Sequence, residues 1–152
     1  MICSQLRRFE SRVMLYLAAA VSDFYLPIDA MNQHKTQSSA GDLELKLKTT
    51  PKVLKILCDE WVPGAMVVTF KLETDPEILM RKARGALNAY GHRVVVANLL
   101  STRRSEVTIV TRGSDGGHES VENLRLTDAQ LKDGTEIETL IVEKLVEFHS
   151  NF

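Results

Sequence analysis

Cysteine and tryptophan are scarce in this 152-residue sequence, which holds two cysteines and one tryptophan. Cys3 and Cys58 show no metal-ligand spacing, and Cys58 lies in an apolar run where a small buried hydrophobe is expected. The four histidines are scattered and form no HExxH pair. The pattern excludes a disulfide-stapled secreted scaffold and predicts no metal site.

An excess of charge of either sign is also missing, because 19 Lys+Arg stand against 20 Asp+Glu. No overall field therefore favours nucleic acid or an anionic membrane as a partner. Two short basic runs, at residues 81–84 and 103–104, are interpreted as a solvated helix face and a solvated loop.

Long apolar runs are absent, and none approaches the roughly 20 residues of a membrane-spanning helix. Three arginines before the apolar residues 13–20 imitate a short secretory signal, with Ala18, Ala19 and Ala20 as a small-residue cleavage site. The alternative is a buried strand that runs into a loop. We favour the strand, because the run is short and Glu10 interrupts the basic flank, and we expect a cytoplasmic protein without a membrane partner.

Several phosphate-binding and nucleophile motifs are missing, namely GxGxxG, GxxxxGK[ST] and GxSxG. The glycine cluster at residues 113–117 imitates a phosphate loop, but no helix opens directly after it. It lies between candidate strands at residues 106–111 and 122–126, so we interpret it as a hairpin turn.

Short apolar runs alternate with amphipathic segments along the chain. Continuous runs predict strands at residues 13–18, 65–70 and 93–98, buried on both faces, and a more edge-like strand at 106–111. Residues 43–48 alternate strictly between leucine and charge, which predicts a strand with one wet face.

Helices are predicted between these strands. The first begins at Thr50-Pro51, with Pro51 at the first helical position, and runs to about Trp61. The second follows Asp75-Pro76 and ends at Gly91. The last begins with a capping box of Thr135 and Glu138. Strands alternating with helices predict an α/β, Rossmann-like parallel sheet with flanking helices and an antiparallel flap or hairpin.

Open parallel sheets bind ligands at the carboxyl ends of their strands. Three predicted strand ends meet there, at residues 18–23, 70–74 and 97–100. Helix or turn capping is an alternative role for Asp23 and Asp75, and turn formation is an alternative for Asn98.

Four ordered motifs carry a family resemblance: Leu-Ala-Ala-Ala-Val-Ser-Asp-Phe-Tyr at 17–25, His-Lys-Thr-Gln-Ser-Ser at 34–39, Phe-Lys-Leu-Glu-Thr-Asp at 70–75 and Val-Val-Val-Ala-Asn at 94–98. From about Met14 to the end, the chain resembles the carboxyl-terminal half of phosphopantothenate–cysteine ligases, in particular the eukaryotic branch. The resemblance implies condensation of 4'-phosphopantothenate with cysteine in coenzyme A biosynthesis. A nucleotide activates the substrate carboxylate as an acyl-nucleotidyl intermediate, and the cysteine amine then attacks the acyl group.

The resemblance assigns substrate binding to Ala19, Ala20 and Asp23 and the catalytic role to Lys35. Short alanine side chains leave the backbone open, and the Asp23 carboxylate can accept hydrogen bonds from pantothenate amides and the hydroxyl. Lys35 matches a lysine on a mobile flap whose ammonium can stabilise the activated carboxyl. By composition alone, Lys35 would be read as a solvated loop lysine.

For the nucleotide, the resemblance assigns Phe70 and Asn98, one offering an aromatic face and the other an amide that donates and accepts. Lys71 and Lys82 are weaker phosphate candidates. The expected nucleotide is ATP, with CTP as the alternative, accompanied by Mg²⁺. Taken alone, Phe70 would be read as a core residue.

The family's upstream half, with a Gly-Gly-Thr turn and an Asn-x-Ser-Ser-Gly segment, has no match in this sequence. We therefore expect a poorly determined leader at 1–12 and a single partial ligase-type domain at 13–152, with one edge of its sheet unpaired. Family members are dimers, so a homodimer or oligomer is expected. The alternative function is a non-catalytic homologue or subunit that folds and oligomerises but needs a glycine-rich partner half for activity.

Overall fold

The computed structural model describes residues 2–34, 42–113 and 118–152. It divides into two compact units, one of Met1–Ala19 with Val53–Phe152 and a smaller one of Ala20–Lys52. Each unit is described by itself below. Within the described residues, no helix is long and apolar enough to cross a membrane.

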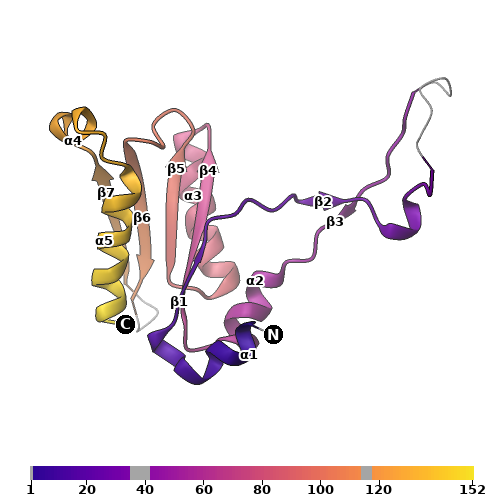
Figure 1. The fold of residues 1–152 in the computed structure, drawn as a ribbon, viewed down its shortest axis with the longest axis horizontal. Coiled ribbons are helices and arrows are strands. Elements are labelled where there is room, and N and C mark those ends of the chain that lie inside the picture. The colour runs from indigo at the N-terminus through magenta and orange to yellow at the C-terminus, as the bar shows by residue number, and fades with distance from the viewer. Residues whose placement is uncertain (1, 35–41, 114–117) are drawn as a thin grey trace. The chain divides into compact units, whose positions relative to one another are not determined.

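The larger unit is built on a five-stranded sheet in the order β1-β4-β5-β6-β7 (Figure 1). Strands β1, β4 and β5 are parallel, while β5, β6 and β7 pair antiparallel. Their bounds are β1 Met14–Leu17, β4 Met66–Glu73, β5 Val94–Leu99, β6 Glu106–Arg112 and β7 Glu119–Arg125. The α/β class is confirmed, and the antiparallel β6–β7 pair confirms the expected hairpin, although its turn residues 114–117 lie outside the described residues.

Two strand environments differ from those expected. The run at 106–111 was expected to be edge-like, but β6 lies inside the sheet between β5 and β7. The run at 13–18 was expected to be buried on both faces, but β1 is an edge strand, with Tyr16 and Leu17 about 40% and 38% exposed. Hydrophobicity predicts a strand but not its neighbours, which is why both positions were missed.

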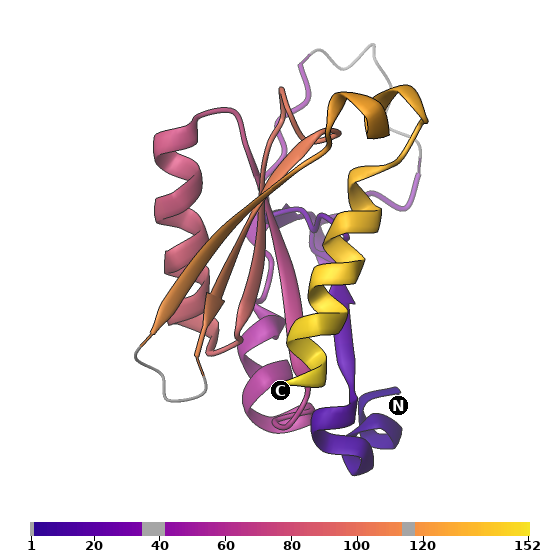
Figure 2. The same cartoon turned by 90° about the vertical axis from the view of Figure 1, so that its left-hand side faces the viewer.

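Helices cover both faces of the sheet (Figure 2). Helix α5 (Ile137–Ser150) packs on one face through Ile137, Ile141 and Leu145. The strand residues on that face are Met66, Val68, Val94, Val96, Val107 and Ile109. Helix α3 (Pro76–Tyr90) covers the other face with Leu79, Ala83, Ala86 and Leu87, against Val95, Ala97 and Val110.

The ends of α3 are as predicted. The Asp75 carboxylate accepts a hydrogen bond from the Glu77 backbone N–H at 2.8 Å, and Pro76 is the first helical residue. Gly91 ends the helix at φ 71°, a left-handed conformation in which a side chain is strained. The capping interpretation of Asp75 is therefore confirmed.

Two other helix starts differ from those expected. Pro51 is not in the first turn, because α2 begins at Val53; it spans Val53–Ile56 and continues as a π-helix, η4, over Leu57–Trp61. The N-cap of α5 is Glu136, which makes no side-chain cap hydrogen bond, so the Thr135 and Glu138 box is wrong. The capping box that forms is that of Thr127 and Gln130, at the start of α4 (Asp128–Lys132).

The first residues of the larger unit form α1 (Ile2–Leu6) and a 3₁₀ helix, η1 (Arg7–Arg12). Glu10 has φ 47°, rare for a residue with a side chain. Its backbone packs closely on Gly64, where an added Cβ would lie 3.1 Å from the Glu10 Cα. Glycine at 64 is therefore what allows η1 to pack on the turn before β4.

The smaller unit holds the two-stranded antiparallel sheet of β2 (Phe24–Tyr25) and β3 (Lys48–Thr49), with a 3₁₀ helix, η2, at Ile28–Ala30. The strand expected at 43–48 is wrong except at Lys48, since the structure assigns no strand to residues 42–47. Alternation alone does not make a strand, because a strand also needs a hydrogen-bonded neighbour.

Candidate functional site

The carboxyl ends of β1, β4 and β5 point the same way, because these three strands are parallel. Ala19 follows β1 in the larger unit, Phe70 and Lys71 lie in the second half of β4, and Asn98 is near the end of β5. The structure thus brings the three predicted strand ends of the larger unit to one edge of the sheet.

Strand register places Phe70 and Asn98 on the same face. Phe70 is opposite Val96, and Asn98 is two residues further along β5, opposite Leu72. The core beneath α5 includes the residues that share this face of β4 and β5, namely Val68, Val94 and Val96. Phe70 packs against that core. Phe70 and Asn98 therefore lie on the α5 face, near the carboxyl edge.

Lys71 lies on the opposite face, which α3 covers. It alternates with Thr69, whose hydroxyl is 2.7 Å from Nε2 of the buried His92. Burial first, and then the nearby charges of Lys71 and Arg112, lower the pKa of His92 to about 4. Lys71 thus contributes to the field around His92, and the structure does not bring it onto the face of Phe70 and Asn98.

Asn98 lies inside β5, so the turn-forming role considered for it is wrong. Its Oδ1 is buried and has no hydrogen-bond partner among the described residues. A buried acceptor without a partner destabilises the fold by about 1–3 kcal/mol. An amide in this state can still accept from, and donate to, a polar ligand, which fits the binding role.

Tyr16 is a residue of this face that the motifs did not single out. Its ring meets the ring of Phe70 edge-to-face, with centroids 4.9 Å apart and planes at 66°. Burial, and secondly the charge of Glu138 in the first turn of α5, raise the pKa of Tyr16. Two aromatic residues in neighbouring predicted strands were visible in the sequence, but the register that joins them was not.

The weaker phosphate candidate Lys82 projects from α3 to the end of β4. Its Nζ is 2.7 Å from Oε1 of Glu73, whose backbone carbonyl accepts from the Leu100 N–H at 2.9 Å. Glu73 was also missed by sequence reasoning. It holds an ammonium group at the carboxyl edge of the sheet, on the α3 side.

The smaller unit contains Ala20 and Asp23. An Asp23 oxygen is 2.6 Å from the Lys52 Nζ, and the Asp23 backbone carbonyl accepts from the Thr50 N–H at 2.9 Å. Both side chains of the ion pair are exposed, so a ligand can reach the carboxylate. Lys35, the predicted catalytic residue, lies outside the described residues.

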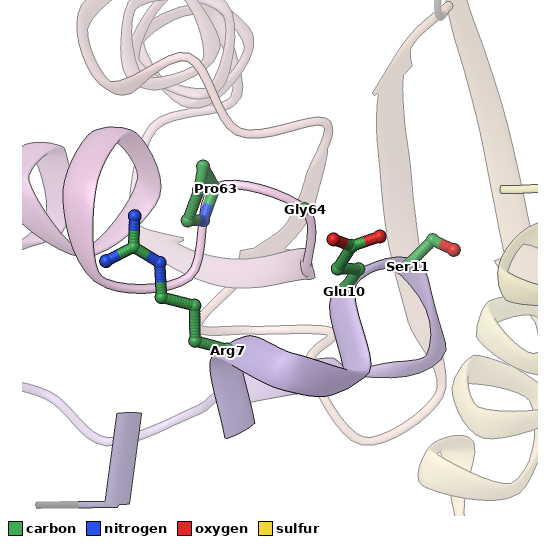
Figure 3. Close-up of a pocket in the computed structure, with 5 residues that line it drawn as sticks. All are labelled: Arg7, Glu10, Ser11, Pro63 and Gly64. Carbon is green, nitrogen blue, oxygen red and sulfur yellow. The ribbon is translucent and has the colours of Figure 1, made fainter. Parts of the chain in front are cut away.

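Two cavities lie at the other end of the sheet, where β4 and β5 begin. One of about 340 Å³ is lined by Arg7, Glu10 and Ser11 of η1 and by the Pro63-Gly64 turn (Figure 3). A second, of about 290 Å³, includes Cys58, whose pKa burial raises to about 11, so its thiol is protonated at neutral pH. None of the predicted site residues that the structure describes lines either cavity. Within the described ranges, no group of three or more His, Cys, Asp and Glu side chains could hold a metal ion.

These features define an α/β domain whose candidate site residues lie at the ends of its parallel strands. Residues 1–128 match the family model for the DNA/pantothenate metabolism flavoprotein C-terminal domain, and the chain belongs to this family. It is 48% identical to the phosphopantothenate–cysteine ligase of Homo sapiens over 139 residues, which is 91% of this chain and 43% of that protein. With the ligase CAB2 of Saccharomyces cerevisiae, identity is 36% over 141 residues, 75% of this chain and 39% of that protein.

Solved structures agree with this assignment. A Cab2 H337A variant in complex with phosphopantothenate-cysteine superposes with a TM-score of 0.83 at 35% identity, over 99% of this chain and 47% of that one. The flavoprotein from Streptococcus pneumoniae, at 20% identity and a TM-score of 0.59, shows the fold alone. The resemblance to the carboxyl-terminal part of these ligases is confirmed, and the chain spans less than half the length of the curated relatives it matches.

Proposed function

We propose that this chain provides part of a phosphopantothenate–cysteine ligase, which joins 4'-phosphopantothenate to cysteine in coenzyme A biosynthesis. The observation that carries the proposal is the likeness to Cab2 solved with phosphopantothenate-cysteine, which extends over 99% of this chain. The 48% identity to the human ligase supports the same activity.

The proposed reaction has two steps. The substrate carboxylate attacks the α-phosphorus of the nucleotide, which forms an acyl-nucleotidyl intermediate and releases pyrophosphate. The cysteine amine then attacks the acyl carbon, and the nucleoside monophosphate leaves. Both steps build negative charge on the acyl oxygen and the phosphate, so a positioned cation lowers their barriers. In this proposal Lys35 supplies that cation.

Substrate binding is proposed for the residues that follow β1. The small side chains of Ala19 and Ala20 leave backbone groups open to the pantothenate chain. The exposed Asp23 carboxylate can accept hydrogen bonds from the amides and hydroxyl of that chain.

Nucleotide binding is proposed for the α5 face at the carboxyl edge. The base stacks on Phe70, while Asn98, whose Oδ1 has no partner among the described residues, bonds to a polar group of the nucleotide. Lys71 and Lys82 lie on the α3 side, where Lys82 is held by Glu73, and are the weaker candidates for contact with the phosphates. ATP is the proposed nucleotide and CTP the alternative. Mg²⁺ would be carried by the phosphates, as is usual for this ion.

We also propose a homodimer in the cytoplasm. The smaller unit presents exposed large apolar side chains at Val21, Phe24, Tyr25, Ile28, Met31, Leu43, Leu45 and Leu47, a density that favours association. Cys3 and Cys58 are both free thiols, which agrees with a reducing compartment.

The second candidate function is a non-catalytic homologue that binds ligand or partner without turnover. These 152 residues include no glycine-rich phosphate-binding segment of the kind whose backbone N–H groups cradle a nucleotide, so turnover requires such a segment from the same protein or from a partner. The two candidates differ in whether activity appears when such a segment is supplied.

The test is pyrophosphate release from ATP, phosphopantothenate and cysteine, with mass in solution measured in parallel. We expect the 152-residue polypeptide by itself to be oligomeric and without measurable turnover. Adding the glycine-rich portion of a relative, in trans or fused in cis, should produce turnover that Phe70→Ala lowers and Val146→Ala, an exposed control near the C-terminal end of α5, does not. Substrate binding without turnover in every combination would establish the non-catalytic candidate instead.

A further inference from the structure

Tyr16 and Phe70 form one aromatic corner on the α5 face of the sheet. Their rings meet edge-to-face at 4.9 Å and 66°, although the two residues are 54 positions apart in sequence. Tyr16 is opposite Val68 in the β1–β4 register. It therefore lies on the same face as Phe70, at the level of the residue two positions before it. Edge-to-face pairs of this kind add about 0.5–1.5 kcal/mol beyond the burial of their surface.

Phe70 is restrained on two sides. Toward the interior, it packs against the core beneath α5. Toward the sheet edge, its neighbour is Tyr16, because β1 is the edge strand among the described residues. Phe70 remains partly exposed, so part of the ring is left for a further contact, on the face that also holds Asn98.

The contribution of Tyr16 comes from its ring and not from its hydroxyl. Among the described residues no hydrogen bond of the Tyr16 hydroxyl is formed. Burial first, and then the charge of the Glu138 carboxylate, raise the pKa of its phenol. A phenylalanine at this position can make the same edge-to-face contact. An alanine cannot.

We propose that Tyr16 is a positioning residue that holds the Phe70 ring in the orientation needed to stack on the nucleobase. The inference rests on the proposed nucleotide site at Phe70. Without Tyr16, the Phe70 ring gains rotational freedom at the open edge of the sheet, and ordering it on binding weakens affinity. Stacking on aromatic side chains tolerates any base, so Tyr16 affects affinity more than base preference.

The experiment is a double-mutant cycle on Mg-ATP affinity, followed by NMR of the aromatic rings at up to millimolar nucleotide, so that weak binding is also measured. Tyr16→Ala should raise Kd about three- to tenfold, while Tyr16→Phe stays within about twofold of the parent chain. In a Phe70→Ala background, Tyr16→Ala should change nothing further. Leu17→Ala is the matched control, because Leu17 is the next residue of β1, 38% exposed against 40% for Tyr16, and points to the other face.

Each outcome is decisive. An equal loss in Tyr16→Phe, or additive losses in the double variant, would overturn the positioning role while the nucleotide site at Phe70 stands. The same holds if Tyr16→Ala binds like the parent chain and Phe70→Ala does not. If Phe70→Ala leaves Mg-ATP affinity unchanged, or the parent chain binds no nucleotide even when the glycine-rich portion of a relative is added, the proposed nucleotide site is wrong and the inference is rejected with it.

Discussion

Phe70 and Lys71 are consecutive residues of β4 and lie on opposite faces of the sheet. Phe70 packs toward the core beneath α5, whereas Lys71 lies on the α3 side with Thr69 and acts on His92. A ligand stacked on Phe70 is therefore on the other side of the β4 backbone from the Lys71 side chain. Although Phe70 and Lys71 are adjacent in one sequence motif, their side chains are therefore available to ligands on opposite faces of the sheet.

This arrangement predicts unequal effects of two neighbouring substitutions. Phe70→Ala should weaken Mg-ATP binding about tenfold, the scale of losing one stacking contact. Lys71→Ala should weaken it about twofold or less, since a contact with phosphate from the far face is solvent-screened. Calorimetric titration of both variants measures the ratio. A larger loss in Lys71→Ala would place the nucleotide on the α3 face.

Much of the fold could be predicted because β4, β5 and α3 carry their own signals. Valine runs predict buried strands, and the Asp75-Pro76 start and Gly91 end predict the helix between them. Pairing partners carry no comparable local signal, so the internal place of β6 and the Tyr16–Phe70 contact were missed. Residues 43–48 show the converse, because their alternation is strong but only Lys48 has a hydrogen-bonded neighbour strand.

Asp23 should act on phosphopantothenate and not on the nucleotide. Its carboxylate belongs to the smaller unit and pairs with Lys52, an exposed ion pair that contributes little to stability. Asp23→Asn removes the charge but keeps the shape, so phosphopantothenate affinity should fall about tenfold or more with the melting temperature unchanged. Calorimetry with each ligand separates the two effects, and Asp29→Asn, in η2, is the control. Equal phosphopantothenate affinity in Asp23→Asn would remove Asp23 from the site.

Lys35 should be needed for chemistry and not for folding, because it lies in a polar segment without apolar periodicity. In a complete, active enzyme, Lys35→Ala should slow turnover about a hundredfold or more, the scale of losing one charge-stabilising donor. Lys46→Ala, another lysine of the same unit, should leave turnover near normal. Turnover and melting temperature measured on both variants decide the point, and near-normal turnover in Lys35→Ala would exclude the assigned role.

His92 should make stability depend on pH. Its pKa is lowered from 6.5 to about 4, so between these values the unfolded chain binds a proton that the folded chain does not. Stability from this group is therefore fully present above pH 6.5 and is lost as pH falls toward about 4, with an upper limit of about 3 kcal/mol. Urea unfolding from pH 7 to 4 should show a shallower pH dependence in His92→Gln than in the parent chain. Parallel curves for the two proteins would contradict the assignment.

Glycines at the middle and the end of α3 should respond to alanine in opposite directions. Gly85 lies in the helix, where an added Cβ meets nothing within 4 Å, so Gly85→Ala gains helix propensity and should stabilise by about 1 kcal/mol. Gly91 ends the helix at φ 71°, where an added Cβ also has space but the backbone is strained, so Gly91→Ala should destabilise by about 1 kcal/mol. The comparison isolates backbone conformation, because neither new methyl group meets a close neighbour. Thermal unfolding should show shifts of about 2–4 °C of opposite sign. Shifts of the same sign would mean that the left-handed turn at Gly91 is not what requires glycine there.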